Sequence, residues 1–163
     1  MNIARETKAH TSMRMVNAYM QMEQNIRFMK RIRKIKINQG LEIDKTGHKT
    51  GKIRLSRLSE KLSTTELKMY FIDFEKGAKS KLHLHDSDQI IVGIKGKGRL
   101  VTYSEIDTID DSTKASLRIN QSIELEENDI VLIPSSTLHW HGASEDQYSS
   151  QMSMMKNGNT VWF

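Results

Sequence analysis

Four of the six histidines of this chain lie in two short segments that could together hold a metal ion. His83 and His85 are separated by one residue, and Gln89 follows shortly after them. Successive side chains of a β-strand point to opposite faces, so His83, His85 and, if the strand is unbroken, Gln89 project to one side. His139, in the second segment, would reach them from another strand, in the facing sheet. Three neutral imidazole nitrogens and one amide oxygen converging inside a barrel form a ligand set for a divalent metal.

Composition narrows the kind of site and the kind of protein. The chain has no cysteine, which excludes disulfides and thiolate ligands, so a metal must be held by histidine, carboxylate or amide groups. Its 163 residues suit one domain with a small appendage. Because the sequence has no run of about 18 apolar residues and no apolar core after its basic start, we expect neither a membrane span nor a secretory signal. The cytoplasm is the simplest expected location.

The net charge of +5 is concentrated in an N-terminal arm. Residues 1–36 hold nine Lys or Arg and two Glu, which is +7, and the other sixteen basic and eighteen acidic residues give −2. Apolar residues of the arm recur at alternating spacings of four and three: Met15, Tyr19, Met22, Ile26 and Met29. This spacing predicts an amphipathic helix that packs on the domain or on a second subunit. A membrane-surface or groove-binding helix and a start codon further downstream are alternatives, whereas the arm is too short for a recognised nucleic-acid module.

The remainder of the chain, residues 37–163, is predicted to fold as many short strands. The segment from Leu67 to Phe74 has the strongest pattern, and residues 89–94, 99–103, 116–125 and 130–133 follow it. No βαβ alternation and no internal repeat is present. Short strands at regular spacing with Gly or Asn/Asp turns predict an all-β barrel or jelly roll.

Several connections and edges are also predicted. Gly96-Lys97-Gly98 is typical of a hairpin, and Asn128-Asp129 of a tight turn. The acidic segment 105–116 is predicted as an exposed loop between strands. Residues 151–155 and 160–163 could each add an edge strand.

The histidine segments resemble the two sequence motifs of the cupin superfamily. In the first motif the spacing from Gly77 through the histidines to Gly96 is complete, but Gln89 replaces the usual glutamate. In the second, Pro134 and His139 are kept, whereas the two glycines and the closing asparagine are replaced, in that order, by Asn128, Ser136 and Ala143. The resemblance implies a cupin-type double-stranded β-helix with a metal centre. It also implies a homodimer, because cupins commonly pair through sheet edges and swapped terminal strands.

A narrower resemblance concerns the segment His139-Trp140-His141-Gly142-Ala143. It is similar to a subgroup of small single-domain cupins that includes manganese-dependent hydroxynitrile lyases and proteins related to carboxymuconolactone decarboxylase operons. Members bind metal through three His and one Gln, which implies the ligands His83, His85, His139 and Gln89. In the cyanohydrin-cleaving members a further histidine transfers protons, and Gln151 stands at that position here. An amide cannot act as a general base, so we do not expect cyanohydrin cleavage.

These observations predict a metal-dependent small-molecule enzyme of the dioxygenase, lyase or isomerase type. Mn(II) or Fe(II) is the favoured ion, with Zn(II) or Ni(II) as alternatives, and four protein ligands leave two octahedral positions open. His141, Tyr70 and Tyr103 are the candidate proton-handling residues, and His141 is expected beside the ligands rather than among them. The alternatives are a non-catalytic barrel that binds a small ligand, and a structural cupin whose histidines are hydrogen-bonded core residues without metal.

Overall fold

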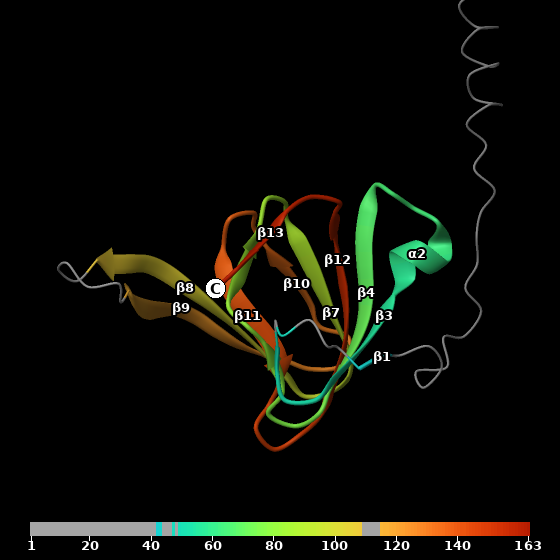
Figure 1. Cartoon of the computed structure of the whole chain (residues 1–163). Coiled ribbons are helices and arrows are strands. Elements are labelled where there is room, and N and C mark those ends of the chain that lie inside the picture. Colours follow the sequence, from blue (N-terminus) through green and yellow to red (C-terminus); the bar gives the residue numbers. More distant parts are fainter. Residues whose placement is uncertain (1–41, 44–46, 48, 109–114) are drawn as a thin grey trace, which may run out of the picture. The chain divides into compact units, whose positions relative to one another are not determined.

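The computed structural model describes residues 42–43, 47, 49–108 and 115–163 (Figure 1). These residues form two antiparallel β-sheets and one short helix, α2 (Leu58–Leu62). The predicted basic arm over residues 1–36 lies outside the described residues. Within the described part of the chain, no helix has both the length and the apolar character needed to cross a membrane.

The first sheet has six strands in the order β1-β3-β4-β12-β7-β10. Their bounds are β1 (Glu42–Ile43), β3 (Ile53–Arg57), β4 (Leu67–Phe74), β12 (Ser149–Lys156), β7 (Gln89–Gly96) and β10 (Ile130–Ile133). The predicted alternation of β4 is confirmed, since Tyr70, Ile72 and Phe74 line one cavity while Asp73 faces away from it.

The second sheet is arranged around β11 and has seven strands. Their bounds are β2 (Lys49–Thr50), β5 (Lys79–Ser80), β6 (His83–His85), β8 (Gly98–Thr108), β9 (Ala115–Leu125), β11 (Leu138–Ala143) and β13 (Thr160–Trp162). β11 pairs with β5 and β6 along one side and with β8 along the other. β13 pairs with β6, so the last strand lies beside the histidine-rich strand.

The interior between the strands combines apolar clusters with many buried polar groups. One cluster contains Ile53, Ile72, Phe74, Ala78 and Ala143, and the other contains Ile91, Leu100, Leu125 and Ile133. The buried polar side chains include Ser80, His83, His85, Gln89, His139, His141, Ser149, Gln151 and Ser153. Buried polar groups need hydrogen-bond or metal partners, so this set indicates a site rather than ordinary core packing.

Two of the predicted connections are wrong. Gly96-Lys97-Gly98 is not a hairpin, because β7 pairs with β12 and β10 whereas β8 pairs with β11 and β9. Gly96 has a φ of +75°, which lets the chain turn from one sheet into the other. The predicted loop 105–116 is shorter than expected, since β8 runs to Thr108 and β9 starts at Ala115. The two strands extend as a ribbon (Figure 1), and their paired backbones do not require an apolar pattern.

One of the two edge-strand predictions is confirmed and the other is wrong. The strand at 160–163 is confirmed as β13, which pairs only with β6 among the described strands. The strand at 151–155 is not at an edge, because β12 lies between β4 and β7. On the inner face of this strand, Ser149, Gln151 and Ser153 hydrogen-bond within the barrel.

Candidate metal centre

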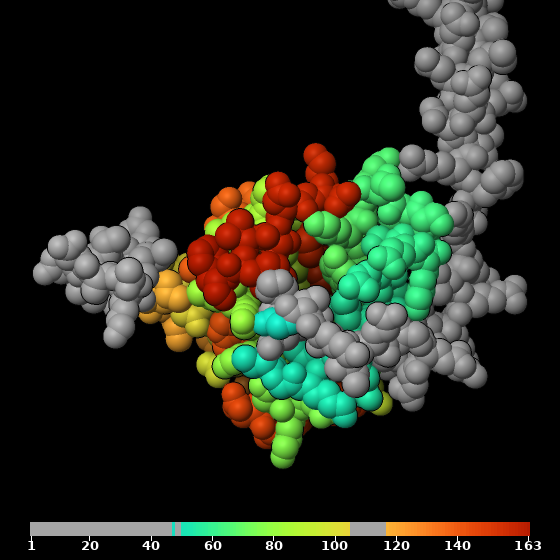
Figure 2. Space-filling view, viewed as in Figure 1, coloured from blue at the N-terminus to red at the C-terminus, as the bar shows by residue number. Residues whose placement is uncertain are grey.

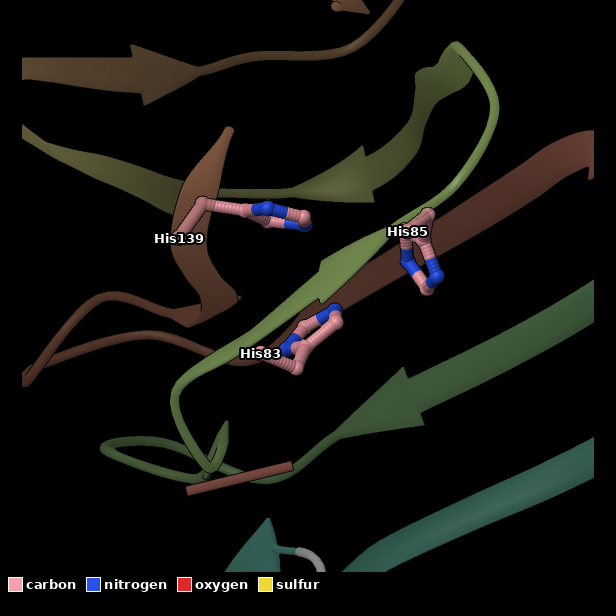
Figure 3. Close-up of side chains that lie close together, drawn as sticks. All are labelled: His83, His85 and His139. Atoms are coloured by element: carbon pink, nitrogen blue, oxygen red, sulfur yellow. The ribbon is translucent and has the colours of Figure 1, made fainter. Parts of the chain in front are cut away.

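Three buried histidines converge where β6 and β11 lie side by side. His139 stands opposite His83 in the antiparallel register, and His85 follows along β6. One ligand nitrogen from each residue lies within 4.8 Å of the others. Figure 3 shows His83 and His85 leaving the same side of β6 and His139 approaching from β11. The predicted trio is therefore brought together in one place.

Backbone carbonyls fix the protonation of two of these rings. His83 Nδ1 lies 2.8 Å from the Lys81 carbonyl oxygen, and His139 Nδ1 lies 2.8 Å from that of Thr137. A carbonyl oxygen only accepts, so each Nδ1 must carry the proton. In the neutral rings this leaves the lone pair on Nε2, which is the nitrogen available to a metal.

His85 supplies the most direct sign of a missing partner. Its Nδ1 lies 2.9 Å from the Thr160 hydroxyl oxygen, whereas its buried Nε2 has no hydrogen-bond partner. Leaving a buried polar atom unsatisfied costs about 1–3 kcal/mol. A divalent ion held by the three imidazoles would satisfy this atom, so the donor set fits a metal.

The surroundings keep the three rings neutral. Burial, followed by the charges of His139 and His141, lowers the pKa of His83 to about 2. Burial, followed by the charges of His139 and Lys68, lowers the pKa of His85 to about 4. Burial also lowers the pKa of His139. Neutral imidazole is the form that binds metals, so protons do not compete for the site near neutral pH.

Gln89 joins the cluster from the other sheet. Its Oε1 lies 2.9 Å from His139 Nε2, and its Nε2 donates to the Ser153 hydroxyl at 2.9 Å. Because His139 is protonated on Nδ1, the two facing atoms both carry lone pairs. A cation bound by the amide oxygen and the imidazole nitrogen would use both lone pairs.

The structure corrects the predicted route by which these ligands meet. The strand is broken after His85, so Gln89 begins β7 in the facing sheet. His139, which was expected from the facing sheet, lies instead in the sheet of His83. Same-side parity along one strand therefore does not explain the position of Gln89.

A second imidazole–amide pair lies beside the cluster. His141 Nδ1 is 2.8 Å from Gln151 Oε1, and Gln151 Nε2 donates to the Gly142 carbonyl at 2.8 Å and to the Ser149 hydroxyl at 3.0 Å. The Gly142 carbonyl fixes the amide orientation, so His141 must donate from Nδ1, and its Nε2 carries the lone pair in the neutral ring. The centroids of the His83 and His141 rings are 5.9 Å apart.

Gly98 leaves the space that this pair requires. A Cβ at this position would lie 2.6 Å from Gln151 Nε2 and 2.8 Å from the Ser149 hydroxyl oxygen. A glycine in the strand therefore marks a close approach of the second pair to the backbone of β8.

The cluster opens onto a cavity of about 400 Å³. Its wall includes His83, His85, Gln89 and His141, together with apolar side chains and residues near the chain end. In Figure 2 the red C-terminal residues border the green residues of α2 and β4 on the face in view. A small molecule in this cavity would contact the cluster directly.

The two candidate tyrosines lie in different places. Tyr70 lines the cavity, and its pKa is raised chiefly by burial, so it remains a neutral phenol that can donate. Tyr103 does not line the cavity; its hydroxyl accepts from the Trp140 indole at 3.0 Å. Parity alone could not distinguish the two tyrosines, because it does not show which face of a strand is inside.

Turn residues hold the segment that precedes His139. The Ser136 amide donates to the His85 carbonyl at 2.7 Å, and Asp88 Oδ1 accepts from the Ser135 amide at 2.9 Å. Ser136 and Asn128, which stand where the cupin motif has glycine, have φ values of 62° and 74°. The glycine backbone conformation is thus retained by residues that adopt it at some cost.

Sequence reasoning missed three contributors to the site. Ser153 orients Gln89, Trp162 stacks on His83 with ring centroids 4.5 Å apart, and Lys68 lines the cavity. The alternation of Ser149, Gln151 and Ser153 was an available signal for an inward polar face. No comparable pattern marked Trp162.

The fold and the site together define a double-sheet β-barrel with a three-histidine cluster able to hold a divalent metal. The chain belongs to the cupin family, since a family model described as Cupin matches residues 44–161. Comparison with curated proteins found no match.

Solved structures show the same fold. A cupin-like protein from Thermotoga maritima has a TM-score of 0.60 and 22% identity, over 77% of this chain and 86% of that one. The polyketide cyclase RemF from Streptomyces resistomycificus has a TM-score of 0.56 and 14% identity, over 79% and 80%. Oxalate decarboxylase from Bacillus subtilis, described with Mn(II) centres, has a TM-score of 0.51 and 16% identity, over 69% of this chain and 28% of that one.

Proposed function

We propose that this protein is a metal-dependent enzyme acting on a small molecule, with Mn(II) or Fe(II) held by His83, His85, His139 and Gln89. The observation that carries the proposal is the buried His85 Nε2, which has no hydrogen-bond partner beside two Nε2 lone pairs. The Mn(II) centres of the structurally similar oxalate decarboxylase support manganese. A bound divalent ion would act as a Lewis acid that polarises a substrate oxygen.

The residues of the cavity would handle protons and orient the substrate. In the neutral ring of His141, Nδ1 donates to Gln151 and Nε2 carries the lone pair, so His141 is suited to accept a proton. Tyr70, a neutral phenol on the same cavity, is suited to donate a hydrogen bond. A dioxygenase, lyase or isomerase could use this arrangement. Within the HWHGA-type subgroup, the proton-transfer role would move from the position of Gln151 to His141.

Metal content tests the proposal most simply. Full-length protein purified without an affinity tag should contain a stoichiometric transition metal, and adding Mn(II), Fe(II), Ni(II) or Zn(II) to stripped protein should raise its melting temperature. His139→Gln should abolish both effects. His141→Gln is the matched control, because it alters a neighbouring histidine and should still bind metal. Metal-free protein whose melting temperature no metal changes would refute the proposal.

A non-catalytic ligand-binding cupin is the second candidate. It is favoured by Gln151, an amide fully engaged in hydrogen bonds where the lyase subgroup has a histidine. Long incubation of the metal-loaded protein with its bound ligands, followed by mass spectrometry of the recovered ligands, separates the two candidates. Unchanged ligands favour the binding module, and a transformed ligand favours the enzyme.

A further inference from the structure

The charges lining the cavity are all of one sign. Its described lining residues include two basic side chains, Arg57 and Lys68, and no carboxylate. The Lys68 ammonium donates to the carbonyl of Gly158, another lining residue. The cavity therefore carries positive charge before any metal is bound.

Three carboxylates outside the cavity lining have partners within the protein. Asp86 accepts from the Asn159 amide at 2.8 Å and does not line the cavity. Asp73 accepts from the Ser150 hydroxyl on the other side of the sheet. Glu60 lies 3.7 Å from the Arg57 guanidinium, and its side chain is 73% exposed. These groups reduce the positive potential from outside but offer no anion inside.

The metal ligands do not supply the missing negative charge. Three neutral imidazoles and one amide would leave a divalent ion with its full charge of +2, since Gln89 stands where most cupins have glutamate. Charges in a partly buried site are stable only when they are paired. The substrate is the remaining source of negative charge.

The rest of the wall is apolar. Leu55, Ile72, Phe74, Met155 and Trp162 line the cavity. Such a wall is suited to burying a hydrocarbon or aromatic body while a few polar groups fix its orientation.

We propose that the cavity takes a small organic acid, with its carboxylate near Lys68 and the metal ligands and its apolar body against the Phe74 wall. This substrate class rests on the proposed metal-dependent function. Benzoate and benzamide are suitable probes because they share an aromatic body and differ in charge.

Calorimetric titration of the metal-loaded full-length protein tests the proposal. Benzoate should bind roughly 10-fold or more tightly than benzamide, and Lys68→Gln should weaken benzoate roughly 10-fold without changing benzamide. Lys68→Arg should keep the preference, which separates loss of charge from misfolding. Lys76→Gln, an exposed lysine that does not line the cavity, is the matched control.

Failure of the organic-acid inference can be distinguished from failure of the proposed metal-dependent function. Metal content measured on the same sample decides whether the proposed function stands. With full metal loading, equal binding of the two probes, no benzoate binding, or an unchanged benzoate affinity in folded Lys68→Gln would overturn the organic-acid inference alone.

Discussion

The barrel contains two imidazole–amide pairs with nearly equal distances, in which the amide oxygen faces a different nitrogen of the ring. In the first pair, Gln89 Oε1 lies 2.9 Å from the unprotonated nitrogen of His139. In the second, Gln151 Oε1 lies 2.8 Å from the protonated nitrogen of His141. The same two residue types therefore form the proposed ligand pair in one place and a hydrogen-bonded pair in the other.

The partners of each pair decide the difference. The Thr137 carbonyl accepts a hydrogen bond from His139 Nδ1, so the unprotonated Nε2 of that ring faces Gln89. In the second pair, His141 donates its Nδ1 proton to Gln151 Oε1. Both rings carry the proton on Nδ1, so the comparison teaches that neither residue type nor tautomer separates the two pairs, whereas the ring nitrogen that faces the amide oxygen does.

Breaking the first pair should have the largest effect. His139→Ala should lower metal affinity by roughly 100-fold or more, because it removes a ligand and the partner of Gln89. Competition with a chromogenic chelator measures the affinity. An affinity equal to that of the unmodified protein would place the metal elsewhere.

Acid should destabilise the metal-free protein through the three-histidine cluster. The folded-state pKa of His85 is about 4, against an ordinary value of 6.5. Between these pH values His85 is therefore protonated in the unfolded chain but not in the folded chain. Protonation of His85 in the unfolded chain thus lowers the free energy of unfolding as pH falls below 6.5. The decrease is on the order of 2 kcal/mol near pH 4 after allowing for screening. Lys68 and Asp86 are the other charged groups that act on this ring.

Urea unfolding at several pH values measures this loss, and His85→Gln is the control. The variant should show a shallower dependence between pH 4 and 6.5. Identical pH profiles for the two proteins would contradict the assignment.

Breaking the second pair should reduce stability but leave the metal in place. Gln151→Leu removes hydrogen bonds to His141, Gly142 and Ser149 and leaves buried polar atoms unsatisfied, which should cost about 2–3 kcal/mol. Thermal unfolding and metal content measure the two effects. Loss of metal at full folding would mean that the pairs are not separate.

Replacing Gln89 with the glutamate typical of cupins should have the smallest effect of these substitutions. Gln89→Glu adds one negative charge beside the cluster and should raise metal affinity roughly 10-fold, about 1.4 kcal/mol. The chelator assay measures it, with Gln151→Glu as the control substitution in the second pair. A larger gain in the control would reverse the roles of the pairs.

The sequence predicts much of the first pair and little of the second. The cupin-like spacing identifies His83, His85, Gln89 and His139, because each follows a short strand or turn whose backbone course the motif specifies. The His141–Gln151 contact depends on β12 pairing between β4 and β7, whereas the sequence led us to expect an edge strand there. Long-range strand order is set by the packing of the whole barrel, and local patterns do not contain it.

Histidine-selective ¹⁵N NMR of the full-length protein during titration with diamagnetic Zn(II) tests the central contrast most directly. The account predicts that the Nε2 resonances of His83, His85 and His139 shift with one equivalent of metal, while His141 keeps its Nδ1–H signal and an unligated Nε2. A metal-induced ligand shift at His141 Nε2, or no shift at His139, would contradict it.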